Sequence, residues 1–190
     1  MPRIGVILGS TRPGRRGEQV ARWVIDIAHR RSDGEFELVD LADYPLPHLD
    51  EPLPPSMGQY QNAHTQRWAA TIGRFDGFVF VTPEYNHSTS GVLKNAIDYL
   101  YAEWNNKAMG VVSYGAVGGA RAAEHLRLVG GELQMADVRT NVALSLFTDF
   151  EKFTDLAPGP HQVEALETLL SQVIAWSDAL APLRASLRAA

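Results

Sequence analysis

The chain has 190 residues, of which 45% are hydrophobic and 21% charged, and its formal net charge is −5. This composition is typical of a globular domain, and residues 1–190 are long enough to bury a large core. The negative charge argues against a nucleic-acid binder. No apolar run approaches the roughly 20 residues that a membrane span requires, so we expect no membrane partner.

The cysteine and histidine content argues against several kinds of site. The chain has no cysteine, which excludes disulfides, thiol catalysis and cysteine-ligated metals. The six histidines form no i,i+4 pair and no HExxH motif, so we expect no metal site. The first residues lack the apolar region and cleavage site of a signal peptide, and we therefore expect a cytoplasmic protein.

Hydrophobic periodicity predicts strands and helices in strict alternation. Apolar runs predict strands over residues 3–9, 36–41, 77–82, 108–113 and 138–145. Amphipathic patterns predict helices over residues 17–31, 62–75, 90–104, 118–130 and 161–188, and Pro182 marks a candidate break in the last helix. Residues 42–60 contain five prolines and are expected to form a long irregular loop.

This alternation predicts an α/β fold in which a parallel sheet is covered by helices on both faces. Five strands suit a flavodoxin-like, doubly wound sheet of order 2-1-3-4-5 that forms a single domain over residues 1–190. Ligands bind such sheets outside the carboxyl ends of the strands, where strands 1 and 3 meet. This rule selects the loops that follow Leu8, Val81 and Val112.

The first of these loops, GSTRPGRRGEQVA, joins a strand to the beginning of a helix. The amino-terminal end of a helix offers free N–H groups and a partial positive charge, which suit a phosphate. Hydroxyls of Ser10 and Thr11 can donate hydrogen bonds, and three arginines, Arg12, Arg15 and Arg16, can pair with phosphate oxygens. The loop matches neither GxGxxG nor GxxxxGKS. The alternative is a polar turn with solvated arginines.

The other two loops are polar or rich in glycine. In TPEYNHSTSG, Pro83 ends the strand, and the following backbone could run along a planar ring with Tyr85 as a wall. A serine or threonine there could instead simply cap the next helix. In SYGAVGGARAAEHL, three glycines could expose backbone donors to the same ring, or only allow the helix to pack closely.

Taken together, the three loops resemble a known family. LGSTRPGR, TPEYNHSTSGVLKNAID and SYGAVGGARAAEHLR are similar to the three signatures of the NADPH-dependent FMN reductase family, in the same order over about residues 3–145. That family has a flavodoxin-like fold and includes flavin, quinone and chromate reductases and some azoreductases. The first loop matches in part, because Arg15 and Gly17 replace a serine and an asparagine that many relatives carry.

The resemblance implies a set of residues around bound FMN. It assigns the phosphate to Ser10, Arg12 and the turn of Arg15, Arg16, Gly17, Glu18 and Gln19. It places the isoalloxazine against Pro83, Glu84, Tyr85, Asn86 and Ser88. It places the pyrimidine side of the ring against Ser113, Gly115, Gly118 and Gly119. For Lys94 and Asn95 we favour a role on the helix surface or in packing.

The implied activity is hydride transfer from NADPH or NADH through FMN to a small acceptor such as a quinone, flavin, chromate, azo or nitro compound. The cofactor carries this chemistry, so no catalytic side chain is expected. A flavodoxin-type electron carrier and a non-catalytic flavin-binding protein remain alternatives. The resemblance implies a homodimer or homotetramer, and the aromatic residues Tyr99, Tyr101 and Trp104 suggest a subunit interface.

Overall fold

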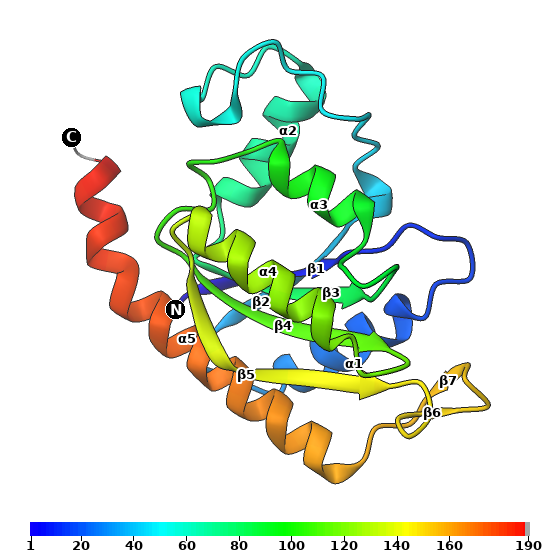
Figure 1. The fold of residues 1–190 in the computed structure, drawn as a ribbon. Helices are drawn as coiled ribbons and strands as arrows, with labels where there is room; N and C mark the ends of the chain where they lie inside the picture. The colour runs from blue at the N-terminus through cyan, green and yellow to red at the C-terminus, as the bar shows by residue number, and fades with distance from the viewer. Residues whose placement is uncertain (189–190) are drawn as a thin grey trace.

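The computed structural model describes residues 1–188, and its centre is one parallel five-stranded sheet (Figure 1). The strands are β1 (Arg3–Leu8), β2 (Glu35–Asp40), β3 (Gly77–Pro83), β4 (Ala108–Gly115) and β5 (Ala136–Ser145). Their order across the sheet is β2-β1-β3-β4-β5, and every neighbouring pair is parallel. The predicted fold class and strand order are therefore confirmed.

Helices cover both faces of this sheet (Figure 1). They are α1 (Gly17–Ala28), α2 (Ala63–Gly73), α3 (Gly91–Asp98), α4 (Ala120–Glu132) and α5 (Pro160–Arg188). One core cluster joins α1 and α5 to the sheet, and a second cluster joins α2, α3 and α4 to its other face. Every connection between neighbouring parallel strands thus includes a helix, as parallel pairing requires.

The side-chain alternation of β1 explains how one strand serves both layers. Ile4, Val6 and Leu8 belong to the cluster that contains α1, whereas Ile7 belongs to the opposite cluster. Nearly all residues of β1 and β3 are buried, so these central strands read as continuous apolar runs rather than as alternating ones.

The prediction of a helix from residue 90 to residue 104 is wrong in its second half. Helix α3 ends at Asp98, and residues 99–106 continue as turns. The Trp104 side chain folds back into the core, where its indole N–H donates to the Ile97 carbonyl at 3.1 Å. Because Tyr99 and Trp104 are fully buried within this chain, they are core residues and provide no evidence for a subunit interface.

Two other features differ from the expectations. A short antiparallel hairpin, β6 (Phe150–Glu151) with β7 (Asp155–Leu156), follows the sheet and was not predicted. Helix α5 continues through Pro182 without the candidate break. Pro182 is exposed, and Arg184 anchors the turn after it by donating to the Asp76 carboxylate at 2.8 Å.

The proline-rich segment, residues 42–60, is a long connection, as predicted. It contains two short 3-10 turns, η1 (Leu41–Asp43) and η2 (Pro55–Met57), and otherwise lacks regular structure. In Figure 1 it passes along the α2 and α3 side of the sheet. Within residues 1–188, no helix has the length and apolarity that crossing a membrane would need.

Candidate functional site

A cavity of about 380 Å³ opens at the carboxyl end of the sheet, where the connections after β1 and β3 meet the proline-rich segment. The three elements contribute the lining residues Ser10, Thr11, Arg12, His48, Tyr85, Ser90, Gly91 and Val92. The position agrees with the rule that ligands of open α/β sheets bind where the strand order reverses. The cavity thus joins the first two loops that the sequence singled out.

Polar hydroxyls gather beneath this cavity. The side chain of Ser10 is fully buried, and its Oγ lies 3.1 Å from the Tyr85 hydroxyl. Tyr114, which the sequence reasoning did not single out, is 5% exposed, and its hydroxyl has no hydrogen-bond partner among residues 1–188. Burial raises the pKa of Tyr114, so its hydroxyl stays protonated and can donate a hydrogen bond. A buried hydroxyl without a hydrogen-bond partner is uncommon, and such a group often reflects a ligand, an ion or a water at the site.

The three predicted arginines have different environments. Arg15 is largely buried and makes a two-point ion pair with Asp40 at 2.8 and 2.5 Å, a further contact to Glu18, and a hydrogen bond to the Ser10 carbonyl. These carboxylates raise the pKa of Arg15 although burial itself lowers it. Arg12 is exposed at the cavity, and its guanidinium makes no hydrogen bond or ion pair with the described part of the chain. Arg12 is therefore the arginine most available to an anion.

Arg16 and Gln19 hold the β6–β7 hairpin. The Arg16 guanidinium donates to the Phe153 carbonyl at 3.2 Å, and the Gln19 amide donates to the Thr154 carbonyl at 3.0 Å. The Gln19 side-chain oxygen accepts from the Leu156 N–H at 2.8 Å. These side chains connect the first loop to the hairpin, a contact that the sequence alone did not indicate.

The beginning of α1 is tightly packed against the side chains beneath it. Its N-cap residue, Arg16, provides no side-chain cap. At Gly17, a Cβ atom would lie 2.7 Å from both the Leu8 Cδ1 and the Tyr114 hydroxyl, so a larger residue would displace one of them. Glycine at this position lets the helix begin directly above the Tyr114 hydroxyl, which leaves uncapped N–H groups and that hydroxyl in the same place.

The β3–α3 loop is a tight turn. Tyr85 and Ser88 exchange two backbone hydrogen bonds, of 2.9 and 3.1 Å, and the two central residues, Asn86 and His87, have φ angles of 47° and 75°. Positive φ at both central positions is the pattern of a type I′ turn. Ser90 then caps α3 by accepting from the Leu93 N–H, and it donates to the Gly9 carbonyl. The second loop is thereby fixed to the first.

Glu84 is held by α4 instead of facing the cavity. Its carboxylate accepts from the Arg121 guanidinium at 2.6 Å and from the Arg121 backbone N–H at 3.0 Å. Burial alone raises the pKa of Glu84, but these hydrogen bonds outweigh burial and lower it overall. The negative charge lies at the first turn of α4, where the helix dipole favours it.

The third loop packs mainly against its own strands. The Ser113 hydroxyl donates to the Gly118 carbonyl at 2.7 Å, and Gly118 and Gly119 both have φ angles of 71°. A Cβ on Gly119 would lie 2.7 Å from the Ser113 Cβ, and one on Gly115 would lie 3.3 Å from the Glu84 Cβ. The glycines therefore allow this loop to fold tightly beside the second one, under Pro83 and Glu84.

Two further side chains support the second loop and were not predicted. The His125 ring nitrogen Nδ1 lies 2.9 Å from the Ser88 hydroxyl, and the Arg121 contact to Glu84 comes from the same helix. Both residues belong to the SYGAVGGARAAEHLR stretch, whose spacing of four places them on one helical face. As expected, Lys94 and Asn95 have structural contacts: Lys94 pairs with Asp98, and Asn95 binds the proline-rich segment.

The arrangement suits a ligand that combines a phosphate, hydroxyls and a flat ring. Arg12, which is unpaired within residues 1–188, and an uncapped helix favour the phosphate, the buried hydroxyls favour polar oxygens, and the β3–α3 turn is a fixed wall beside the cavity. Within the described chain, no group of three or more histidine, aspartate or glutamate residues is placed to hold a metal ion.

Comparison with known sequences agrees with this interpretation. The sequence model of the NADPH-dependent FMN reductase family matches residues 2–149. The chain is 45% identical over 150 residues to an NAD(P)H-dependent FMN reductase of Schizosaccharomyces pombe, covering 78% of this chain and 75% of that protein. It is 34% identical over 166 residues to a quinone reductase of Pseudomonas putida, covering 80% and 84% respectively.

Solved structures show the same fold. FerB of Paracoccus denitrificans, a flavoenzyme NAD(P)H:acceptor oxidoreductase, superposes with a TM-score of 0.73 over 94% of this chain and 98% of its own, at 20% identity. A WrbA-like flavodoxin of Agrobacterium tumefaciens superposes with a TM-score of 0.58 at 16% identity.

Proposed function

Because this chain belongs to the NADPH-dependent FMN reductase family, we propose that residues 1–190 act as one domain that binds FMN at the carboxyl end of its sheet. The protein is an NAD(P)H-dependent flavin oxidoreductase, as its FMN reductase and quinone reductase relatives are. The proposal concerns which residues hold the cofactor and which acceptor the enzyme reduces.

One observation supports the phosphate position above all: the buried, unpartnered Tyr114 hydroxyl lies directly beneath the uncapped beginning of α1. Arg12 supplies an unpaired positive charge beside the same cavity. We therefore assign the phosphate to Arg12, Ser10, the Tyr114 hydroxyl and the first N–H groups of α1. Arg15, Arg16, Glu18 and Gln19 would act mainly by shaping this loop, since the side chains of these four residues already contact other parts of the protein.

The ring of the flavin would lie against the second and third loops. Pro83, Tyr85, Asn86 and Ser88 supply its bed, and Glu84 supports that bed through Arg121. Ser113, Gly115, Gly118 and Gly119 would close the pyrimidine side. These contacts remain predictions from the family resemblance, and the fixed turn at Tyr85–Ser88 supports them because it needs no rearrangement to accept a flat ring.

When bound, FMN accepts a hydride from NAD(P)H and passes the electrons to an acceptor. The residues of the chain then have three tasks: to bind the phosphate, to orient the ring, and to leave one side open to the two substrates in turn. None of these tasks needs a side-chain nucleophile. For the acceptor we propose a quinone, the substrate class in the name of the Pseudomonas putida relative.

The proposed function is tested by visible spectroscopy. The purified protein is titrated with FMN and then reduced anaerobically with NADPH or NADH. We expect flavin bands that bleach with the reduced nucleotide and return when 1,4-benzoquinone is added. Binding without bleaching would instead favour the electron carrier, and a lack of FMN binding would contradict the site.

The residue assignment is tested with Arg12→Gln. Removing a charged donor from a phosphate should weaken FMN binding by about 10- to 100-fold, from a loss of about 1.5–3 kcal/mol. The matched control is Arg22→Gln, which removes the same charge from an exposed position of α1. Equal FMN dissociation constants for the two variants would exclude Arg12 as a phosphate ligand.

The cellular compartment and the assembly state are also proposals. We propose a homodimer or homotetramer on the family resemblance alone, and a cytoplasmic location as the sequence led us to expect. Light scattering of the purified protein gives its molar mass, and assaying FMN reductase activity in cell fractions gives its compartment.

A further inference from the structure

A second, larger cavity adjoins the proposed flavin site. Its volume is about 740 Å³, and it lies between the first loop, the proline-rich segment and the beginning of α3. The lining is largely apolar and includes Leu41, Tyr44, Leu46, Pro47 and Val92. Four residues, Thr11, His48, Gly91 and Val92, line both cavities. A molecule in the larger cavity would therefore touch whatever occupies the smaller one.

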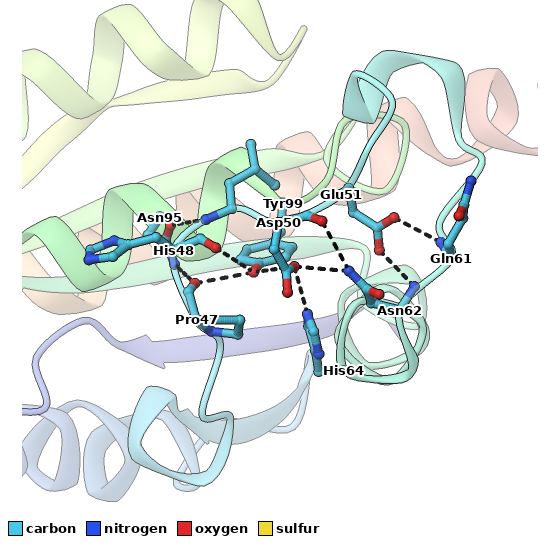
Figure 2. Close-up of polar contacts among 10 residues, drawn as sticks. Pro47, His48, Asp50, Glu51, Gln61, Asn62, His64, Asn95 and Tyr99 are labelled. Carbon is cyan, nitrogen blue, oxygen red and sulfur yellow. Dashed lines mark hydrogen bonds and ion pairs between the residues drawn. The ribbon is translucent and has the colours of Figure 1, made fainter.

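His48 is the titratable side chain at the junction of the two cavities that has no other task. The Tyr44 hydroxyl already pairs with Thr71 at 3.2 Å, and the Asn95 amide already binds the backbone of the proline-rich segment. The His48 imidazole makes no hydrogen bond or ion pair with any other residue that the structure describes, and it is exposed. In Figure 2 the ring points away from the polar cluster around Asp50.

The backbone around His48 is fixed from both sides (Figure 2). Asn95 donates to the Pro47 carbonyl at 2.7 Å and accepts from the Leu49 N–H at 3.1 Å. The buried Tyr99 hydroxyl donates to Asp50 at 2.9 Å and lies 3.3 Å from the His48 carbonyl. A free imidazole on a backbone fastened by distant side chains is what a substrate contact requires.

We propose that the larger cavity binds a planar aromatic acceptor of the quinone class, and that the His48 imidazole donates a hydrogen bond to one of its carbonyl oxygens. The inference rests on the proposed flavin site, because the acceptor must lie beside the flavin ring to be reduced. Tyr85, part of the proposed bed of that ring, lines the smaller cavity that adjoins the larger one. The apolar walls suit an aromatic ring, and pockets of this kind take their orientation from a few polar groups.

The same imidazole supplies the proton that quinone reduction needs. A quinone becomes a hydroquinone by gaining two electrons and two protons, and a hydride delivers both electrons and one of the protons. His48 would provide the second proton: its N–H bond breaks as the O–H bond of the hydroquinone forms. The exposed ring then regains a proton from solvent, as in ordinary acid catalysis by a positioned side chain.

Three variants and one control test the proposal. His48→Ala removes the donor, whereas His48→Gln keeps a hydrogen-bond donor that cannot release a proton. Ala42→Trp fills the larger cavity from an exposed residue that does not line the smaller one. His29→Ala removes an exposed histidine that follows the carboxyl end of α1. FMN binding is measured first for each protein.

For His48→Ala we expect the KM for 1,4-benzoquinone to rise about 10-fold, since a lost hydrogen bond of about 1.4 kcal/mol is a factor of ten. His48→Gln should keep a KM within about 3-fold while kcat falls about 100-fold, at the low end of what a positioned acid contributes. Ala42→Trp should raise the KM for a naphthoquinone more than for benzoquinone. His29→Ala should behave as the parent protein.

A measurement of quinone binding in the absence of turnover completes the test. In the flavin-free protein, 1,4-naphthoquinone should shift the ring resonances of His48 in the NMR spectrum and leave those of His29 in place. If the parent protein binds FMN and is reduced by NAD(P)H, but His48→Ala keeps its quinone KM and kcat and the resonances do not shift, the inference fails while the proposed function stands. If the parent protein binds no FMN, both fail.

Discussion

The proline-rich segment and the β3–α3 loop border the same cavity, but they are held in opposite ways. Distant side chains hold the proline-rich segment: Asn95 and Tyr99 of the α3 region bind its backbone, and its Glu51 carboxylate accepts two N–H groups, from Gln61 and Asn62. The β3–α3 loop holds itself through a turn at Tyr85–Ser88 and a helix cap at Ser90. The first therefore depends on tertiary packing, whereas the second combines a local turn and cap with contacts from α4 to Glu84 and Ser88.

This contrast predicts that the stability of the β3–α3 loop depends most strongly on its helix cap, Ser90. Ser90→Ala removes the cap of α3 and leaves the buried Gly9 carbonyl without its donor. We expect the free energy of unfolding to fall by about 2 kcal/mol, as for other lost caps with a buried partner. Chemical denaturation measures this free energy of unfolding. The control, Ser32→Ala, alters an exposed serine and should leave the stability unchanged. Equal stabilities would show that the loop does not depend on its cap.

The proline-rich segment should instead respond to a residue far away in sequence. Tyr99→Phe keeps the buried ring but deletes a hydroxyl that binds Pro47 and Asp50. Burial and the Asp50 carboxylate raise the pKa of Tyr99 to about 12, so the hydroxyl is a donor at all physiological pH values. We expect a loss of about 1 kcal/mol and faster proteolysis within residues 45–60.

The control for that measurement is Tyr101→Phe, because the Tyr101 hydroxyl makes only two long contacts: it donates to the Glu132 carbonyl at 3.4 Å and accepts from the Gln134 side-chain amide at 3.4 Å. If Tyr99→Phe and Tyr101→Phe are cleaved at the same rate, the proline-rich segment is not held from α3.

The smallest effect that we predict is a difference between the two regions in acid: the proline-rich segment should lose more protection than the β3–α3 loop. The hydrogen bond from His64 lowers the pKa of Asp50 below its ordinary value of 3.8, and the bonds from Tyr99 and Asn62 act in the same direction. A lowered folded-state pKa means that this stabilisation is present above pH 3.8 and is lost as the pH falls through the folded-state value. Hydrogen-exchange protection factors of residues 45–60 should therefore fall between pH 5 and pH 3 more than those of residues 84–89.

The matched variant for the acid measurement is Asp50→Asn, which carries no titrating group at this position. It should show reduced protection of residues 45–60 already at pH 5 and little further change in acid. A proline-rich segment equally protected at pH 5 and pH 3 in the parent protein would argue that Asp50 does not hold it.

Much of the fold was readable from local patterns because those patterns reflect burial. The apolar runs of β1 and β3 are buried on both faces, so both strands and the order of the sheet followed from alternation with amphipathic helices. The errors lie where packing overrode propensity. Trp104 ends α3 early by folding into the core, and α5 continues through Pro182 because its last turns are anchored by Arg184.

By itself, the sequence determined the sheet, its carboxyl-end loops and the glycine, proline and serine residues that shape them, because these depend on backbone preferences of a few neighbouring residues. Only the tertiary structure decided which side chains are free. It pairs Arg15 with Asp40 and Arg16 with the hairpin. Among the residues that the structure describes, it leaves the Arg12 and His48 side chains without hydrogen-bond partners and buries the Tyr114 hydroxyl without an acceptor. Partners far apart in sequence meet only after folding, so no local pattern encodes which arginine stays available.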